Sequence, residues 1–411
     1  MATRHTAKGN ELREILRTFF ICCILLGMAI LAQTAVSSIN SQGSIVSQAA
    51  ASPSPPHSNH IVFIILENHP LSSITCSDCA PYMRSLANLY ANSTNYVGPV
   101  SSLWNPSLPN YLGLISGQTW ECTDTFPNSG GCSTAPWRCS SPCNMVDRLS
   151  SAGISWKGYM EGMPGSDICN GNGSANSGTN YVPRHNPFVY FSNIVNNPTR
   201  CSLVVPSGIS GGAISCGTSV TTSVISNLVT DLNASAPNFS WVTPNLFDDS
   251  HNCVVQQADD WLSVVVPAIL TTKTFETDMS ATVVVTFDEP ETGTYGTTPI
   301  YFVVSGPGAR HHYSSSTRFT HPNWLATIES NWSLSCLVSG NDCGATAMSE
   351  FLTAVTPPSS PSGFCLQCLV RNLSSSPLLI GLAVGLTMAA SGVILARRRS
   401  RPAVPSVGEA S

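Results

Sequence analysis

Charged side chains are scarce in this sequence of 411 residues. Only 10% of the residues are Asp, Glu, Lys or Arg, whereas about 25% is usual in soluble globular proteins. The net charge of −5 is small for the length, and the 18 Lys and Arg residues form no basic stripe. Because nucleic-acid binding needs cations aligned against phosphates, the composition excludes nucleic acid as a partner. Solubility must then depend on neutral polar side chains.

Apolar runs of the kind that enter membranes occur only near the two ends. The run Phe19–Ala32 follows four basic residues and leads into small residues, as in a signal peptide or an uncleaved signal anchor over 1–37. The run Leu378–Ala396 carries no charge and is followed by three arginines. It predicts a C-terminal transmembrane helix over 377–396 with a cytoplasmic tail over 397–411. We therefore expect a single-pass protein at the cell surface with its main domain outside, attached to the membrane through that helix.

The cysteines agree with an oxidising compartment. Of the 16 cysteines, two lie in the N-terminal apolar run and fourteen in the external segment, an even number. Three pairs are close enough in sequence to form local disulfides: Cys76 with Cys79, Cys336 with Cys343, and Cys365 with Cys368. A zinc site at Cys76-x-x-Cys79 is an alternative, although no second pair of similar spacing lies nearby. Six Asn-x-Ser/Thr sequons also suit an external glycoprotein.

The pattern of the middle segment predicts an α/β domain. Linkers rich in Ser and Pro over 38–58 and 356–376 bracket a domain at 59–355, and no internal repeat is present. The apolar runs 60–66, 281–287 and 300–304 are typical of strands buried on both faces, and helical patterns at 81–91 and 259–270 alternate with them. This alternation predicts a three-layer domain with a mostly parallel central sheet.

Acidic and amide residues follow two of these strands. Glu67 and Asn68 come after the first, and Asp288 and Glu289 after the second. Loops at the carboxyl ends of parallel strands converge on one edge of the sheet. Several carboxylates gathered there are costly unless a cation lies among them. The sequence therefore predicts a site for a divalent metal ion whose identity is open.

Seven ordered segments resemble one known family. The most telling are NPSLPNYLGLISG at 105–117 and VVVTFDE at 283–289; the others lie at 60–74, 154–164, 184–191, 242–253 and 320–334. They resemble the phosphoesterase family of bacterial phospholipases C and acid phosphatases, whose core is similar to alkaline phosphatase. The resemblance covers about 60–335 and implies an alkaline-phosphatase-like fold. His69 stands where phospholipase-like members often have Arg, so the chain is more similar to the acid-phosphatase branch.

The resemblance also implies roles for individual residues. In such enzymes the hydroxyl of the Pro-Ser/Thr segment is the nucleophile, which is Ser107 here. Glu67, Asn68, Asp288 and Glu289 would hold the metal together with Ser107, although Glu289 stands where some members have Asp. Metal coordination would activate the serine, and a phosphoserine intermediate would follow. His185, His251 and His321 fall in motifs similar to active-site segments and are the expected donors to phosphate or leaving group, favouring mildly acidic pH.

Three functional alternatives remain open at this stage. The substrate could be a phosphate monoester, as for an acid phosphatase, or a phospholipid, as for a phospholipase C. A catalytically inactive surface or adhesion domain could retain the fold, but such a domain would be expected to lose part of the site. Sulfatase chemistry is disfavoured because Tyr111 stands where the sulfatase maturation motif needs Arg. Oligomeric state is open.

Overall fold

The computed structural model describes residues 56–353, apart from 77, 125–141, 166–167, 169–177, 210–211 and 292–293. The predicted signal segment, the linker at 356–376, the transmembrane helix, the tail and the Cys365–Cys368 pair lie outside the described residues, as does most of the linker at 38–58. Among the described helices, none has the length and apolarity needed to cross a membrane.

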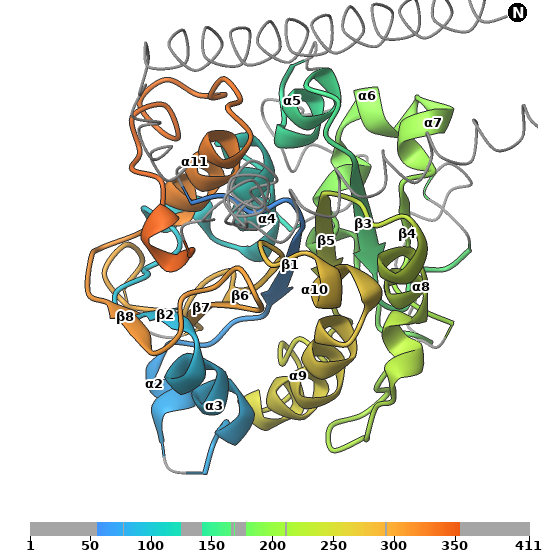
Figure 1. Ribbon diagram of the computed structural model, residues 1–411, viewed down its shortest axis with the longest axis vertical. Coiled ribbons are helices and arrows are strands. Elements are labelled where there is room, and N and C mark those ends of the chain that lie inside the picture. The colour runs from blue at the N-terminus through green and yellow to red at the C-terminus, as the bar shows by residue number, and fades with distance from the viewer. Residues whose placement is uncertain are drawn as a thin grey trace, which may run out of the picture. The chain divides into compact units, whose positions relative to one another are not determined.

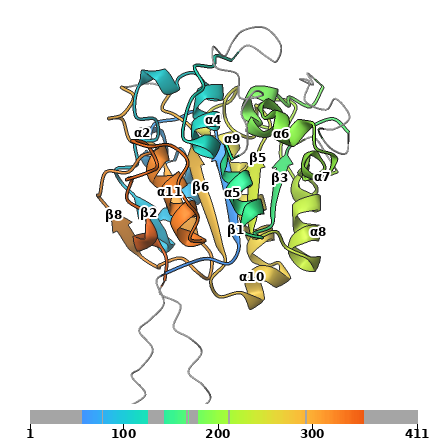
Figure 2. The same ribbon diagram turned by 90° about the horizontal axis from the view of Figure 1, so that it is seen from above.

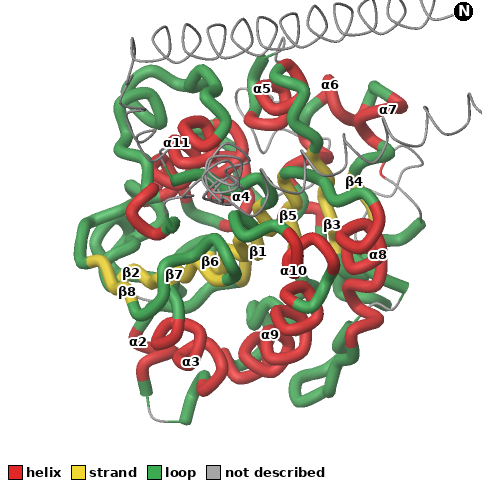
Figure 3. Tube along the Cα trace, in the orientation of Figure 1, coloured by secondary structure: helices red, strands yellow, loops and turns green. Residues whose placement is uncertain are grey.

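A mixed eight-stranded sheet forms the centre, in the order β4-β3-β5-β1-β6-β7-β2-β8 (Figures 1 and 3). The strands are β1 (Ile61–Leu66), β2 (Ala91–Ser93), β3 (Trp156–Met160), β4 (Val204–Pro206), β5 (Phe239–Thr243), β6 (Thr282–Phe287), β7 (Phe302–Ser305) and β8 (Tyr313–Ser315). All neighbouring pairs are parallel except those of β7 with β6 and with β2. The predicted three-layer, mostly parallel design is therefore confirmed, with one antiparallel strand that the sequence did not indicate.

Helices cover both faces of the sheet (Figure 1). One face carries α2 (Ser72–Thr75), α3 (Pro81–Leu89), α8 (Ser226–Ala234), α9 (Val255–Leu270) and α10 (Lys273–Thr277). The other face carries α4 (Ser107–Ser116), α5 (Met145–Ser151), α6 (Ser192–Val195), α7 (Pro198–Cys201) and α11 (His321–Asn331). The central strands β1 and β6 are buried along their whole length, which explains why they are continuously apolar in sequence.

Disulfides fix loops in the described part of the chain. Cys76–Cys79 and Cys336–Cys343 form as predicted, and the first of these excludes the zinc alternative at that motif. A third bridge, Cys216–Cys253, joins residues 37 positions apart and was not predicted. One of the sequon residues, Asn92, lies half-buried on β2, where its amide nitrogen donates hydrogen bonds to two backbone carbonyls.

The two ends of the described segment lie together at the amino edge of the sheet, where β1 begins (Figure 2). Thr353 N donates to the carbonyl of Gly308, just beyond the end of the antiparallel strand β7. Pro56 and Thr353 line one cavity of about 500 Å³. The opposite, carboxyl edge is thus left free of both ends.

Candidate active site at the carboxyl edge of the sheet

Ser107 is the first residue of helix α4 and is 3% exposed. The helix ends at Gly117, whose φ of +73° lies in the left-handed region that glycine tolerates. At its start, the Leu108 N–H donates to Asp124 Oδ1 at 2.9 Å. The hydroxyl of Ser107 donates to Glu67 Oε2 at 2.8 Å. The predicted nucleophile therefore lies at a helix N-terminus, where the helix dipole favours negative charge.

The predicted carboxylates come together because β1 and β6 are neighbouring parallel strands. Glu67 directly follows β1, and Asp288 and Glu289 directly follow β6; all three are buried. Asn110, one turn along α4 from Ser107, donates to Glu289 Oε2 at 2.7 Å. Asn68 also hydrogen-bonds to the Glu289 side chain. The structure therefore brings the five predicted metal-binding residues together at one edge of the sheet, at the ends of β1 and β6 and the start of α4.

Burial changes the acidity of these groups. It raises the pKa of Glu67 to about 8, with the charge of Glu289 as the next cause. Burial also raises the pKa of Glu289 to about 7. The pKa of Asp288 lies well above its usual value because of burial and the nearby charges of Glu67 and Glu289. Without a cation, Glu67 would hold a proton at neutral pH and Glu289 would be partly protonated.

The residues present fit a divalent metal ion. Asp249, which follows β5, adds a fourth buried carboxylate to the cluster. Asp288 Oδ2 and Asn110 Oδ1 are buried and accept no hydrogen bond from any described residue. Arg184 acts on Glu67, but it is partly exposed and paired with another acid, Asp124, at 3.6 Å. Carboxylate and amide oxygens with this excess of negative charge are a donor set that suits a hard or borderline cation.

His185 lies between two of these carboxylates. Its Nε2 is 3.3 Å from Glu67 Oε1 and its Nδ1 is 3.2 Å from Asp249 Oδ2. The ring stacks on the ring of Tyr111, with centroids 5.2 Å apart and planes 3° apart. His185 is 2% exposed, so both ring nitrogens are directed into the site.

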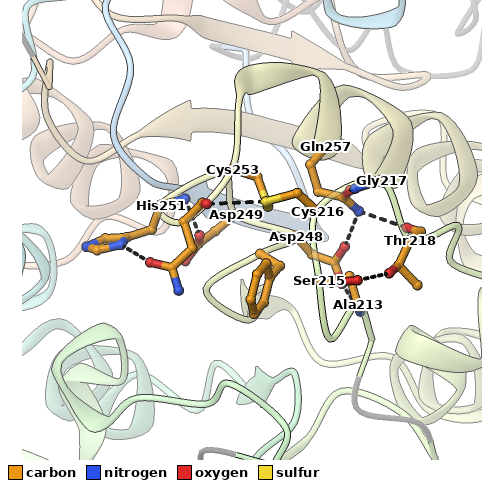
Figure 4. Close-up of a disulfide and its surroundings, with 12 residues drawn as sticks. Ala213, Ser215, Cys216, Gly217, Thr218, Asp248, Asp249, His251, Cys253 and Gln257 are labelled. Carbon is orange, nitrogen blue, oxygen red and sulfur yellow. Dashed lines mark hydrogen bonds between the residues drawn. A yellow bond between two sulfur atoms is a disulfide. The ribbon is translucent and has the colours of Figure 1, made fainter.

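His251 is partly buried and lies on the loop after β5 (Figure 4). Its Nδ1 is 2.9 Å from Asn252 Oδ1, and its Nε2 is 3.4 Å from the Arg184 guanidinium. One ligand atom from each of Glu67, His185 and His251 lies within 4.8 Å of the other two, so these three residues could also hold a metal ion. Burial lowers the pKa of His251, and Arg184 lowers it further.

His321 begins helix α11 and is completely buried. Its Nδ1 is 2.8 Å from the Tyr96 hydroxyl, and its Nε2 is 2.5 Å from the backbone carbonyl of Asp288. Burial lowers its pKa to about 3. Gly98 allows this contact, because a Cβ on its backbone, with φ of +60°, would lie 3.2 Å from both the His321 ring and the Asp288 carbonyl. A direct catalytic role of His321 stays a prediction. Its contact with the backbone carbonyl of Asp288 shows that it supports the loop after β6.

Sequence reasoning missed three of the residues that the fold gathers here. Asp249 belongs to the segment 242–253, in the loop that follows the buried strand β5. Asn110 and Tyr111 lie three and four residues after Ser107, hence on the same side of α4. By contrast, Lys157 and Tyr159, which could have lined an entrance, both bind Asp231 on α8, at 2.7 and 2.6 Å.

Comparisons with known proteins identify the family of this chain. A family model described as the Phosphoesterase family matches residues 76–335. The probable acid phosphatase of Kluyveromyces lactis is 29% identical over 244 residues, covering 57% of this chain and 50% of that protein. The phosphate-repressible acid phosphatase of Penicillium chrysogenum is 28% identical over 260 residues, covering 62% and 55%. The chain thus spans about half the length of these two relatives.

Other matches extend over more of the partner's length. The phosphatidylinositol-3-phosphatase of Mycobacterium tuberculosis is 28% identical over 300 residues, covering 71% of this chain and 83% of that protein. Among solved structures, an alkaline phosphatase superfamily protein from Vibrio parahaemolyticus matches with a TM-score of 0.45 and 10% identity, covering 68% of each chain.

Proposed function

Because this chain belongs to the phosphoesterase family, we propose that it is an acid-phosphatase-like hydrolase of phosphate esters that depends on a divalent metal ion. The observation that carries the proposal is the hydrogen bond of 2.8 Å from Ser107 to Glu67 inside the buried carboxylate cluster. An inactive surface domain would not need to keep such a costly group of buried acids together.

In the proposed reaction, Ser107 Oγ forms a bond to phosphorus while the bond from phosphorus to the substrate's alcohol oxygen breaks. The serine proton passes along its hydrogen bond to Glu67, and the leaving alcohol takes a proton from solvent. Water then attacks the phosphoserine and gives a proton to the Nε2 atom of His251 while the bond from phosphorus to Ser107 Oγ breaks. Glu67 returns its proton to the serine oxygen, which restores the hydroxyl, and inorganic phosphate leaves.

The metal ion, when bound by Glu67, Asn68, Ser107, Asp288 and Glu289, would supply positive charge to the serine oxygen and to the phosphoryl oxygens. Neighbouring residues of the chain hold these metal-binding side chains in place. Asn110 and Asn68 hold Glu289 by hydrogen bonds, and His321 holds the Asp288 backbone. The N-terminus of α4 adds a favourable dipole. We place this activity at the cell surface, as the apolar ends of the sequence predict.

Hydrolysis of p-nitrophenyl phosphate by the purified protein, with divalent metals added singly, tests the proposal. We expect turnover that requires metal and falls at least about a thousandfold in Ser107→Ala. Ser85→Ala, at an exposed serine on α3, is the matched control and should keep wild-type turnover. Metal-independent turnover, or turnover that survives Ser107→Ala, would show that this site does not act as proposed.

A second candidate substrate, the phosphate group of a membrane lipid, is favoured by the distribution of exposed apolar side chains. Five of the seven large exposed ones in the described residues follow carboxyl ends of strands, on the edge that holds the site: Val100, Leu103, Ile209, Ile214 and Val254. The other two, Leu89 and Met279, lie at the amino edge. An apolar rim of this kind suits contact with a lipid surface.

A double variant in this apolar rim, compared with a control variant at the opposite edge, distinguishes a lipid substrate from a soluble phosphate ester. We expect Leu103→Ser combined with Val254→Ser to lower hydrolysis of a phosphatidylinositol phosphate in vesicles while p-nitrophenyl phosphate turnover stays unchanged. Met279→Ser, at the opposite edge, is the control and should change neither rate. Equal rates on vesicles for all variants would leave the soluble phosphate ester as the favoured substrate.

A further inference from the structure

The loop that carries His251 is held in place by a disulfide and by backbone hydrogen bonds. Cys253, two residues after His251, forms a disulfide with Cys216 (Figure 4). The backbone N–H of Asn252 donates to the Leu246 carbonyl at 2.8 Å, and that of His251 donates to Asp249 Oδ1 at 2.7 Å. The loop is thus bound on both sides of Asn252.

The partner loop, 212–218, is itself anchored to the core of the fold (Figure 4). Ala213 N donates to Asp248 Oδ2 at 2.7 Å, and Gly217 N donates to Gln257 Oε1 at 2.8 Å. The amide nitrogen of Gln257 donates hydrogen bonds to Asp248 Oδ1 and to the Thr218 carbonyl. Asp248 and Gln257 are both buried. The disulfide therefore connects the His251 loop to a rigid base.

Asn252 determines which nitrogen of His251 carries the proton. Its Oδ1 atom, 2.9 Å from His251 Nδ1, can only accept a hydrogen bond, so this contact is favourable when Nδ1 is the protonated nitrogen. The other nitrogen, Nε2, is 3.4 Å from the guanidinium of Arg184, which can only donate. Two partners of opposite character thus favour the same neutral form, in which the Nε2 lone pair is directed toward Arg184, close to Glu67 and His185.

We propose that Asn252, held in place by the Cys216–Cys253 disulfide, is a positioning residue that fixes the orientation and the protonated nitrogen of His251. This inference rests on the proposed function, in which His251 Nε2 accepts the proton of the attacking water. In the alternative form, with the proton on Nε2, the ring could neither accept that proton nor bind a metal ion from this side. Loss of Asn252 would therefore act on the chemical step more than on substrate binding.

The test compares Asn252→Ala with Asn252→Asp, since a carboxylate oxygen can still accept from Nδ1. We expect kcat to fall roughly ten- to a hundredfold in Asn252→Ala with KM nearly unchanged, and to return most of the way in Asn252→Asp. Asn233→Ala, at an exposed asparagine next to α10, is the matched control. Wild-type kcat in Asn252→Ala would overturn the assignment.

A spectroscopic measurement separates this inference from the proposed function. NMR of protein labelled with ¹⁵N in histidine reports the protonated ring nitrogen whether or not any substrate is turned over. We expect one form, protonated at Nδ1, in the wild type, and a mixture in Asn252→Ala and in the Cys216→Ser, Cys253→Ser double variant. The Cys76→Ser, Cys79→Ser double variant removes a disulfide elsewhere and should keep the single form.

The outcomes are distinguishable. A wild type that shows the Nδ1-protonated form but no turnover would refute the proposed function and leave the positioning role standing. A single unchanged form in the Cys216→Ser, Cys253→Ser variant would refute the role of the disulfide. A wild type protonated at Nε2 would refute the inference as a whole. If Asn252→Ala fails to fold, the disulfide variant and Asn252→Asp still decide between these results.

Discussion

Replacing Glu329 by Gln should make the protein more stable at alkaline pH and leave it unchanged at acidic pH. Glu329 lies on α11 and is 4% exposed; its side chain hydrogen-bonds to Asp342, which is 2% exposed. Asp342 accepts hydrogen bonds from the backbone of Leu337 and Val338, at 2.6 and 3.0 Å, inside the loop closed by a disulfide. Glu329 is thus suited to hold the proton in its hydrogen bond to Asp342.

Burial, followed by the charge of Asp342, raises the pKa of Glu329 from 4.5 to about 8. Because the folded-state pKa lies above the unfolded value, the folded state binds more protons between these two pH values. The stability that this proton provides is complete below about pH 4.5 and is lost as the pH rises toward about 8. At about 1.36 kcal/mol per pH unit, the loss is at most about 5 kcal/mol.

Glutamine keeps the hydrogen bond to Asp342, since its amide donates, but it has no proton to lose. Allowing for partial solvation of the loop, we expect Glu329→Gln to raise the free energy of unfolding by roughly 2–4 kcal/mol at about pH 8 and by almost nothing at about pH 4.5. The melting temperature, measured by calorimetry across this range, should show a gap that widens with pH. Glu276→Gln, at an exposed carboxylate on α10, is the control. A gap that is constant or narrows with pH would refute the reasoning.

Three further predictions concern the active-site side of the sheet. Gly113→Ala should lower the free energy of unfolding by about 1–3 kcal/mol, because its Cβ would lie 2.1 Å from the Trp104 ring; an unchanged urea midpoint would contradict this. Metal affinity, measured by calorimetry with Mn²⁺, should weaken as the pH falls from about 8 to about 6, because Glu67 and Glu289 must then release protons; affinity that rises on acidification would argue against these ligands. Asn110→Ala should reduce metal affinity roughly tenfold by freeing the Glu289 side chain, and equal affinity in equilibrium dialysis would count against this role.

Local patterns in the sequence predicted the central elements because burial on both faces leaves a clear signature. The predicted strands at 60–66 and 281–287 match β1 and β6 to within one residue at each end. The run at 300–304 also forms a strand, two residues later, as β7. In the fold it pairs antiparallel with both β6 and β2. Apolar content alone carries no information on strand direction.

Contacts between distant segments were harder to predict. Cys216 and Cys253 are 37 residues apart, and their pairing depends on two loops meeting at the carboxyl edge. Sequence spacing identifies only local disulfides. Likewise, His321 lies in a telling motif, but only the structure shows that both of its ring nitrogens are bonded, one to Tyr96 and one to the Asp288 backbone. Motifs identify which residues gather, whereas the fold determines which of their atoms remain available.

The closeness of Pro56 and Thr353 at the amino edge makes this fold a good candidate for circular permutation. A short peptide could join the two ends without crossing the sheet, and a new start could be opened in an exposed loop. Immobilisation of the 56–353 domain on a bead through Pro56 or Thr353 would likewise point the carboxyl edge toward the medium. The same geometry would allow two copies to be fused head to tail with both sites accessible.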